Sequence, residues 1–131
     1  MKKFVIFSIM VLMASLAFAQ MNQRYPWAST RDDVISREMS EPIKITDDML
    51  VFKFMFNGEE SVISYKFVDG LLTMQTIMVD TWMFNDLATA CKMLYGVPTR
   101  MGDNLVWANK ESMIALSYSN GKLFYTLMAR K

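Results

Sequence analysis

From residue 49 onward, several segments have the apolar runs or the alternation of hydrophobic and polar residues that are typical of β-strands. Segment 60–68 shows the alternation most clearly, because Ile63, Tyr65 and Phe67 fall on one side and Ser64 and Lys66 on the other. Similar patterns predict strands at residues 49–56, 71–80, 104–109, 112–119 and 122–130. The chain is therefore predicted to be rich in antiparallel β-structure.

Three dipeptides mark tight turns between these strands: Asn57-Gly58, Asp69-Gly70 and Asn120-Gly121. Asn, Asp and Gly accept the positive φ angles that a type I′ turn requires. Each dipeptide stands directly between two strand patterns, so we expect three two-residue hairpins.

A helix is predicted ahead of the first group of strands. Ser29 or Thr30 supplies its N-terminal cap, and Pro42 prevents its continuation. Its apolar stripe consists of Val34, Ile35 and Met39.

A second helix is predicted ahead of the later strands. Asn85 or Asp86 caps it, and Gly96 followed by Pro98 ends it. Trp82 precedes the cap and is interpreted as a hydrophobic staple that holds the helix against the sheet. The apolar positions of this helix are Leu87, Ala90, Cys91, Leu94 and Tyr95.

The order of one helix followed by three strands occurs twice, which predicts an internal repeat. Pro42 aligns with Pro98, and Asp69-Gly70 aligns with Asn120-Gly121. We expect one α+β domain of two tandem αβββ units, at about 27–80 and 83–130, with both helices on one face of an antiparallel sheet. The sequence leaves open whether the units share one continuous sheet.

The N-terminus has the pattern of a secretory signal peptide. Lys2 and Lys3 precede an apolar stretch at 4–14, and Ala17-Phe18-Ala19 has the small-x-small form of a cleavage site. The alternative is an uncleaved anchor, but the apolar stretch is shorter than the ~20 residues that span a bilayer. We expect a signal peptide at 1–19, cleavage after Ala19 and a periplasmic or secreted domain at 20–131.

Composition excludes several kinds of chemistry. The 131 residues include no His and one Cys, with 14 basic and 13 acidic side chains. Imidazole catalysis, an intramolecular disulfide and electrostatic binding of nucleic acid are therefore not expected. Cys91 is interpreted as a buried apolar residue, with an intermolecular disulfide as the alternative.

Neither the acidic doublets nor the methionines predict a metal site or cofactor. The acidic doublets are Asp32-Asp33, Asp47-Asp48 and Glu59-Glu60, and such residues are common at helix starts and in turns. Adjacent residues on a strand also point to opposite faces, which is poor geometry for two carboxylates that share a proton. The chain has 14 Met, whose thioethers are soft ligands for Cu(I). The nearest pair on one strand, Met74 and Met78, does not bring several sulfurs together, so filling of the core is the preferred interpretation.

The sheet face opposite the helices keeps apolar residues, as an interaction surface requires. We therefore predict a non-catalytic module that binds another envelope or extracellular protein, although a homodimer or the N-terminal segment can also cover this face. One alternative is a carrier of a small apolar ligand or lipid between helices and sheet. Another is an enzyme that uses carboxylates, Lys or Tyr, which no spacing supports. The predicted contact residues are Val51, Met55, Ile77, Phe124 and Met128.

Three motifs give the chain a resemblance to a known superfamily over most of residues 27–130. They are Gly96-Val97-Pro98, Phe67-Val68-Asp69-Gly70-Leu71-Leu72 and Asn120-Gly121-Lys122-Leu123. In these motifs the chain resembles the beta-lactamase inhibitor protein and the small outer-membrane lipoproteins of the SmpA/OmlA type. The resemblance implies a protein-binding module whose open sheet face receives a partner. The stapling disulfides of the inhibitor cannot form with Cys91 alone, and the anchoring cysteine of the lipoproteins is missing.

Overall fold

The computed structural model describes residues 23–56 and 58–130, which form two α-helices, one 3-10 helix and eight strands. The predicted signal peptide, 1–19, lies outside the described residues. The first half comprises α2 (Arg31–Arg37), β1 (Lys44–Ile45), β2 (Met49–Phe56), β3 (Glu59–Val68) and β4 (Leu71–Val79). The second comprises η1 (Thr81–Met83), α3 (Phe84–Tyr95), β5 (Thr99–Met101), β6 (Asn104–Ala108), β7 (Ser112–Ser119) and β8 (Lys122–Ala129).

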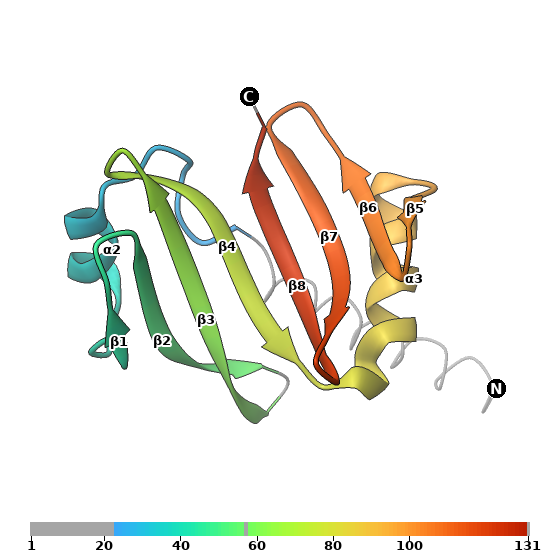
Figure 1. The fold of residues 1–131 in the computed structure, drawn as a ribbon, viewed down its shortest axis with the longest axis horizontal. Helices are drawn as coiled ribbons and strands as arrows, with labels where there is room; N and C mark the ends of the chain where they lie inside the picture. Colours follow the sequence, from blue (N-terminus) through green and yellow to red (C-terminus); the bar gives the residue numbers. More distant parts are fainter. Residues whose placement is uncertain (1–22, 57, 131) are drawn as a thin grey trace, which may run out of the picture.

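The strands form one antiparallel sheet in the order β1-β2-β3-β4-β8-β7-β6-β5. The last strand of each half, β4 and β8, meets the other at the centre of the sheet. Figure 1 shows the helices at opposite ends of this row, with α2 near β1 and α3 near β5. The predicted α+β class is confirmed, and the sheet is continuous.

The predicted hairpin turns between β3 and β4 and between β7 and β8 have left-handed backbone at both turn positions. The φ angles are 53° at Asp69, 79° at Gly70, 52° at Asn120 and 75° at Gly121. These values are of the sign that a type I′ turn requires, and they match the right-handed twist of the flanking strands. Both turns therefore fix the register of their hairpins, in which Phe67 pairs with Leu72 and Tyr118 with Leu123.

The hydrophobic core lies between the helices and one face of the sheet. Val34 of α2 and Leu87 and Cys91 of α3 pack with inward-facing strand residues such as Tyr65 and Tyr125. Trp107 is also buried, and its Nε1 donates a hydrogen bond of 2.9 Å to the carbonyl of Gly96. This bond links β6 to the end of α3.

The first helix is capped as predicted but is shorter than its apolar pattern suggests. Thr30 and Asp33 form a capping box, and the helix ends at Arg37. Met39 lies beyond its end and is exposed, and Ile35 is also exposed, so Val34 is the buried member of the predicted stripe. A helix of two turns presents few positions to the core, which explains this difference.

The second helix differs from the prediction at its start. It begins at Phe84, after Met83 and without a side-chain cap, so the predicted caps Asn85 and Asp86 are wrong. Trp82 is 60% exposed and is not a staple, whereas Met83 is 4% exposed and belongs to the core. In the 3-10 turn of η1, Met83 faces inward and Trp82, the residue before it, does not.

The C-terminal part of α3 also carries more exposed apolar surface than expected. Leu94 is 57% exposed, and Met93 and Val97 are exposed beside it. Over the described residues, neither helix combines the length and apolar character that crossing a membrane demands.

Candidate binding face and neighbouring sites

The sheet has a second face, opposite the core, which we call the open face. Its residues alternate with the buried core residues along the long strands, apart from one irregularity in β4, and most of them are only partly buried. Its larger apolar residues include Met49, Val51, Met55, Val62, Met74, Met78, Val106, Met113, Phe124 and Met128. Within residues 23–56 and 58–130, both helices pack against the other face, so this apolar surface has no helical cover.

Four of the five predicted contact residues lie on the open face. Val51 and Met55 come from β2, and Phe124 and Met128 come from β8. Met55 is the most exposed of them at 59%, and the other three are partly buried. The register places Met78 of β4 directly opposite Phe124, so the surface continues across the central strands.

The fifth predicted contact residue, Ile77, lies on the core face and is 0% exposed, which corrects the prediction. The cause is an irregularity in the pairing of β3 with β4. Lys66 pairs with Met74 but the next residue, Phe67, pairs with Leu72, so Thr73 is an extra residue in β4. A bulge of this kind changes which face the following residues point to.

Methionines line up across the open face in a way that their sequence positions do not reveal. Met74 of β4 pairs with Met128 of β8, which in turn pairs with Met113 of β7. Three thioether side chains therefore stand side by side on three adjacent strands. Lys66 separates them from a further methionine, Met49 of β2.

The charged residues of the open face lie mainly toward its first-half edge. Lys53 and Glu60 form an exposed ion pair, with Nζ and Oε1 separated by 3.5 Å. Glu60 thus points to the open face, while its neighbour Glu59 points to the other. The two side chains therefore point to opposite faces, as predicted for adjacent strand residues, but both residues lie in β3 and not in the predicted turn.

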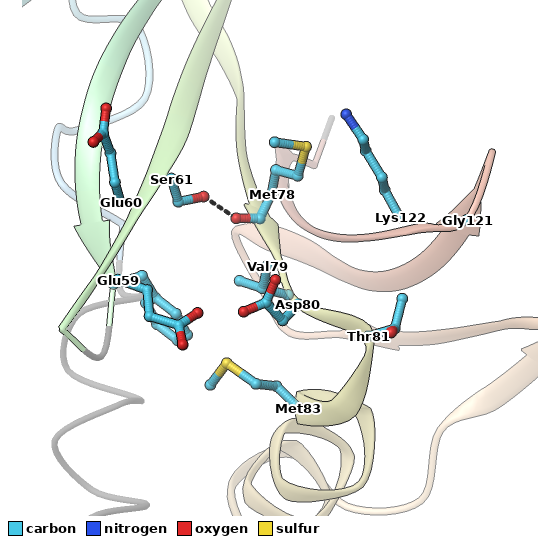
Figure 2. A pocket seen from close by; sticks show the side chains of 11 residues that line it. Glu59, Glu60, Ser61, Met78, Val79, Asp80, Thr81, Met83, Gly121 and Lys122 are labelled. Atoms are coloured by element: carbon cyan, nitrogen blue, oxygen red, sulfur yellow. Dashed lines mark hydrogen bonds between the residues drawn. The ribbon is translucent and has the colours of Figure 1, made fainter.

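Glu59 takes part in a carboxyl pair that the sequence did not reveal. Figure 2 shows the carboxyl groups of Glu59 and Asp80 directed toward one another at a shallow hollow of about 190 Å³. A hydrogen bond with the Asp80 side chain, and then repulsion between the charges, raises the pKa of Glu59. Ser61 and Lys122 also line this hollow, and Ser61 Oγ donates a hydrogen bond to the carbonyl of Met78. Such a pair can share a proton, but its exposure to water weakens the coupling.

A second hollow, of about 340 Å³, lies between the end of α3 and the inner face of β7 and β8. Tyr95, Tyr125 and Ser112 line it together with Ile114 and Leu127. Ser112 also accepts at its Oγ a hydrogen bond of 2.9 Å from Nε1 of Trp27.

Cys91 lies beside Tyr125, which hydrogen-bonds to its thiol. Burial raises the pKa of the thiol to about 11, so it carries a proton at neutral pH. The predicted burial of Cys91 is confirmed, with 1% of the residue exposed. A protonated, buried thiol is a weak nucleophile and a weak metal ligand.

A buried polar cluster connects α2, the N-terminal segment and the sheet. Glu38 Oε1 accepts hydrogen bonds from the hydroxyls of Tyr25, at 2.8 Å, and Tyr65, at 2.9 Å. Arg24 lies 3.5 Å from the same oxygen, and its backbone N–H donates to Gln75 Oε1. Burial is the main cause that raises the pKa of Tyr25 to about 12 and also raises that of Tyr65.

The chain was compared with family models, curated proteins and solved structures. No family model, curated protein or solved structure matches it.

Proposed function

We propose that the protein is an exported, non-catalytic binding module that docks another protein on the open face. The observation that carries this proposal is the apolar surface across β2, β3, β4, β8 and β7, which both described helices leave uncovered. Monomeric soluble proteins rarely expose a large contiguous apolar surface unless it contacts something. The signal-peptide pattern at 1–19 supports export, and the partner is then an envelope or extracellular protein.

The chemistry of the face favours a partner with apolar side chains. Phe124 lies on β8, a central strand of the sheet. Met78 of β4 lies directly opposite it, and Met128 follows it by four residues on the same face of β8. Aromatic residues are favoured at the centres of interfaces, and methionine side chains adapt their shape to different partners. The ion pair of Lys53 with Glu60 lies toward the rim, where charged groups contribute to orientation more than to affinity.

We also propose that the two halves are a repeat. Each half has a helix followed by four strands. In both halves the first strand lies at an edge of the sheet and the last strand lies at its centre. The turns at Asp69-Gly70 and Asn120-Gly121 occupy equivalent places, between the last two strands of each half. This organisation is also what the resemblance to the beta-lactamase inhibitor protein and the SmpA/OmlA lipoproteins implies.

Capture from envelope extract and culture supernatant tests the function. The bait is the purified protein, and the variants Phe124→Asp and Met128→Asp place a charge on the open face. The matched control is Met93→Asp, because Met93 is an exposed methionine of α3 outside the open face. We expect the parent to capture one protein partner saturably. Both open-face variants are expected to bind this partner at least tenfold more weakly, and the control is expected to bind it as the parent does.

Circular dichroism must show that each variant keeps the fold of the parent. Equal retention of the partner by the open-face variants and the parent would refute the docking surface. Loss through Met93→Asp alone would instead place the contact at the exposed end of α3.

The second candidate function is a carrier of a small ligand, which the hollow beside Tyr95 and Tyr125 favours. Its volume of about 340 Å³ is at the lower end of the range for small-molecule sites. Native mass spectrometry of the purified protein tests it directly. A stoichiometric small molecule, with no protein partner in the capture experiment, would overturn the binding-module proposal.

A further inference from the structure

The row of methionines on the open face brings together donor atoms of one chemical kind. Met74, Met128 and Met113 occupy directly opposed positions on β4, β8 and β7. Opposed residues on neighbouring strands have Cβ atoms about 5 Å apart, and adjacent strands lie about 4.8 Å apart. The outer two sulfurs therefore approach the central one if each side chain leans inward by roughly half a strand spacing.

Methionine is suited to that movement. Its side chain is unbranched and flexible, and its thioether is soft and polarizable. All three side chains are partly buried, so neighbouring groups confine them without removing them from solvent. None of the three belongs to the hydrophobic core, because the buried cluster lies on the other face of the sheet.

We propose that Met74, Met113 and Met128 form a site for one Cu(I) ion on the open face. Soft sulfur ligands select Cu(I) among the common biological metals, whereas Mg²⁺, Ca²⁺ and Mn²⁺ prefer oxygen. Three thioethers remain neutral at every accessible pH, so the site binds the ion without releasing a proton. The proposal does not depend on docking of a partner.

The charges near the row permit a monovalent cation. Lys66 pairs with Met74, but it is exposed and its long stem carries the ammonium into water. Arg130 follows Met128 by two positions, but its Nη1 donates a 2.9 Å hydrogen bond to the carbonyl of Asn109. Its guanidinium is thereby held by the loop between β6 and β7.

The residues in the next row help to select a soft metal. Thr76 and Thr126 stand beside the methionines, with their hydroxyl oxygens 3.4 Å apart. Neutral hydroxyls are poor ligands for hard divalent cations in the absence of a carboxylate. In the part of the chain that the structure describes, no group of three Asp, Glu or Cys residues is placed to hold a metal.

Anaerobic titration of the purified protein with Cu(I), against the chromogenic chelator bicinchoninate, tests this site. We expect one equivalent of Cu(I) to be withdrawn from the chelator, and X-ray absorption to show sulfur as the only ligand. Met128→Leu and, independently, Met74→Leu are expected to weaken the affinity at least tenfold. Leucine replaces methionine at similar volume, so both variants are expected to keep their fold.

Two controls separate this site from other sulfurs. Met78→Leu removes a methionine of the same face and strand but outside the row, and Cys91→Ser removes the thiol. Both are expected to bind Cu(I) as the parent does. Absence of competition with the chelator, parental affinity in Met128→Leu and Met74→Leu, or loss of binding in Cys91→Ser would each overturn the proposal. None of these results bears on the capture of a protein partner, so the two proposals fail separately.

Discussion

Replacement of Glu38 by alanine tests the buried polar cluster that fastens the N-terminal segment and α2 to the sheet. The Glu38 side chain is 7% exposed and accepts hydrogen bonds from two tyrosine hydroxyls. Alanine removes the acceptor and leaves the hydroxyl of Tyr65, a residue that is 0% exposed, without this hydrogen-bond partner. Tyr25 loses the same partner at a site nearer the surface.

The expected loss of stability follows from these contacts. A buried donor without a partner costs about 1–3 kcal/mol, and two are left here. The Arg24 side chain is 36% exposed and can turn to water, so the loss of its ion pair adds little. We therefore expect Glu38→Ala to lower the free energy of unfolding by about 3 kcal/mol, a large part of the ~5–15 kcal/mol typical of a domain.

Urea unfolding, followed by tryptophan fluorescence, measures this loss. Tyr65→Phe removes one donor while the carboxylate keeps its other partners, so we expect a loss of about 1 kcal/mol. The loss of stability in the double variant is expected to be smaller than the sum of the two single losses by about 1 kcal/mol, because both substitutions remove the same hydrogen bond. The matched control is Glu41→Ala, since Glu41 is an exposed carboxylate just beyond Glu38, and its effect is expected within about 0.5 kcal/mol of zero.

If Glu38→Ala unfolds with the stability of the control, the Glu38 carboxylate does not stabilise the cluster. Strict additivity of Glu38→Ala and Tyr65→Phe would mean that the hydroxyl and the carboxylate do not interact.

Three further predictions address pH, a turn and the start of α3. Burial raises the pKa of the Cys91 thiol from 9.0 to about 11, so the thiol of the unfolded state ionises first. Stability is therefore lost as pH rises through this range, by about 3 kcal/mol, and Cys91→Ala is expected to flatten the profile of unfolding midpoint against pH. Gly121→Ala meets no atom within 4 Å but keeps φ at 75°, so chemical unfolding is expected to show a loss of about 1 kcal/mol from backbone strain alone. Met83→Ala is expected to cost about 2–4 kcal/mol and Trp82→Ala under 1 kcal/mol in the same assay; the reverse order would show that Trp82 is the packed residue.

Local sequence patterns predicted most of the sheet because its long strands alternate and their turns have distinctive residues. Residues 49–56 and 112–119 form β2 and β7 with the expected bounds. The short edge strands β1 and β5 were missed, because two or three exposed residues carry no alternating pattern. Edge strands of this kind are defined by their neighbours rather than by their own sequences.

The assignment of residues to faces was wrong where the chain departs from strict alternation. Leu72 is inward, and a regular strand would then turn Ile77 outward, but the extra residue Thr73 reverses the order. A bulge leaves no reliable mark in a single sequence. The outward positions of Val51, Met55, Phe124 and Met128 follow from regular strands, which explains why these were predicted correctly.

The methionine row was hidden from the sequence for a different reason. Met74 and Met128 become neighbours only through the pairing of β4 with β8, which joins the two halves. Patterns within one strand do not specify which strand lies beside it. The same limit applies to the carboxyl pair of Glu59 and Asp80, whose members come from β3 and the end of β4.

The central position of β8 has a consequence for how the protein is made. β8 is the last strand along the described chain, yet it holds the middle of the sheet. During synthesis, one long edge of β4 therefore remains unpaired until β8 has been made. An unpaired edge invites pairing with other chains, so a nascent or truncated chain needs a chaperone far more than the finished protein does.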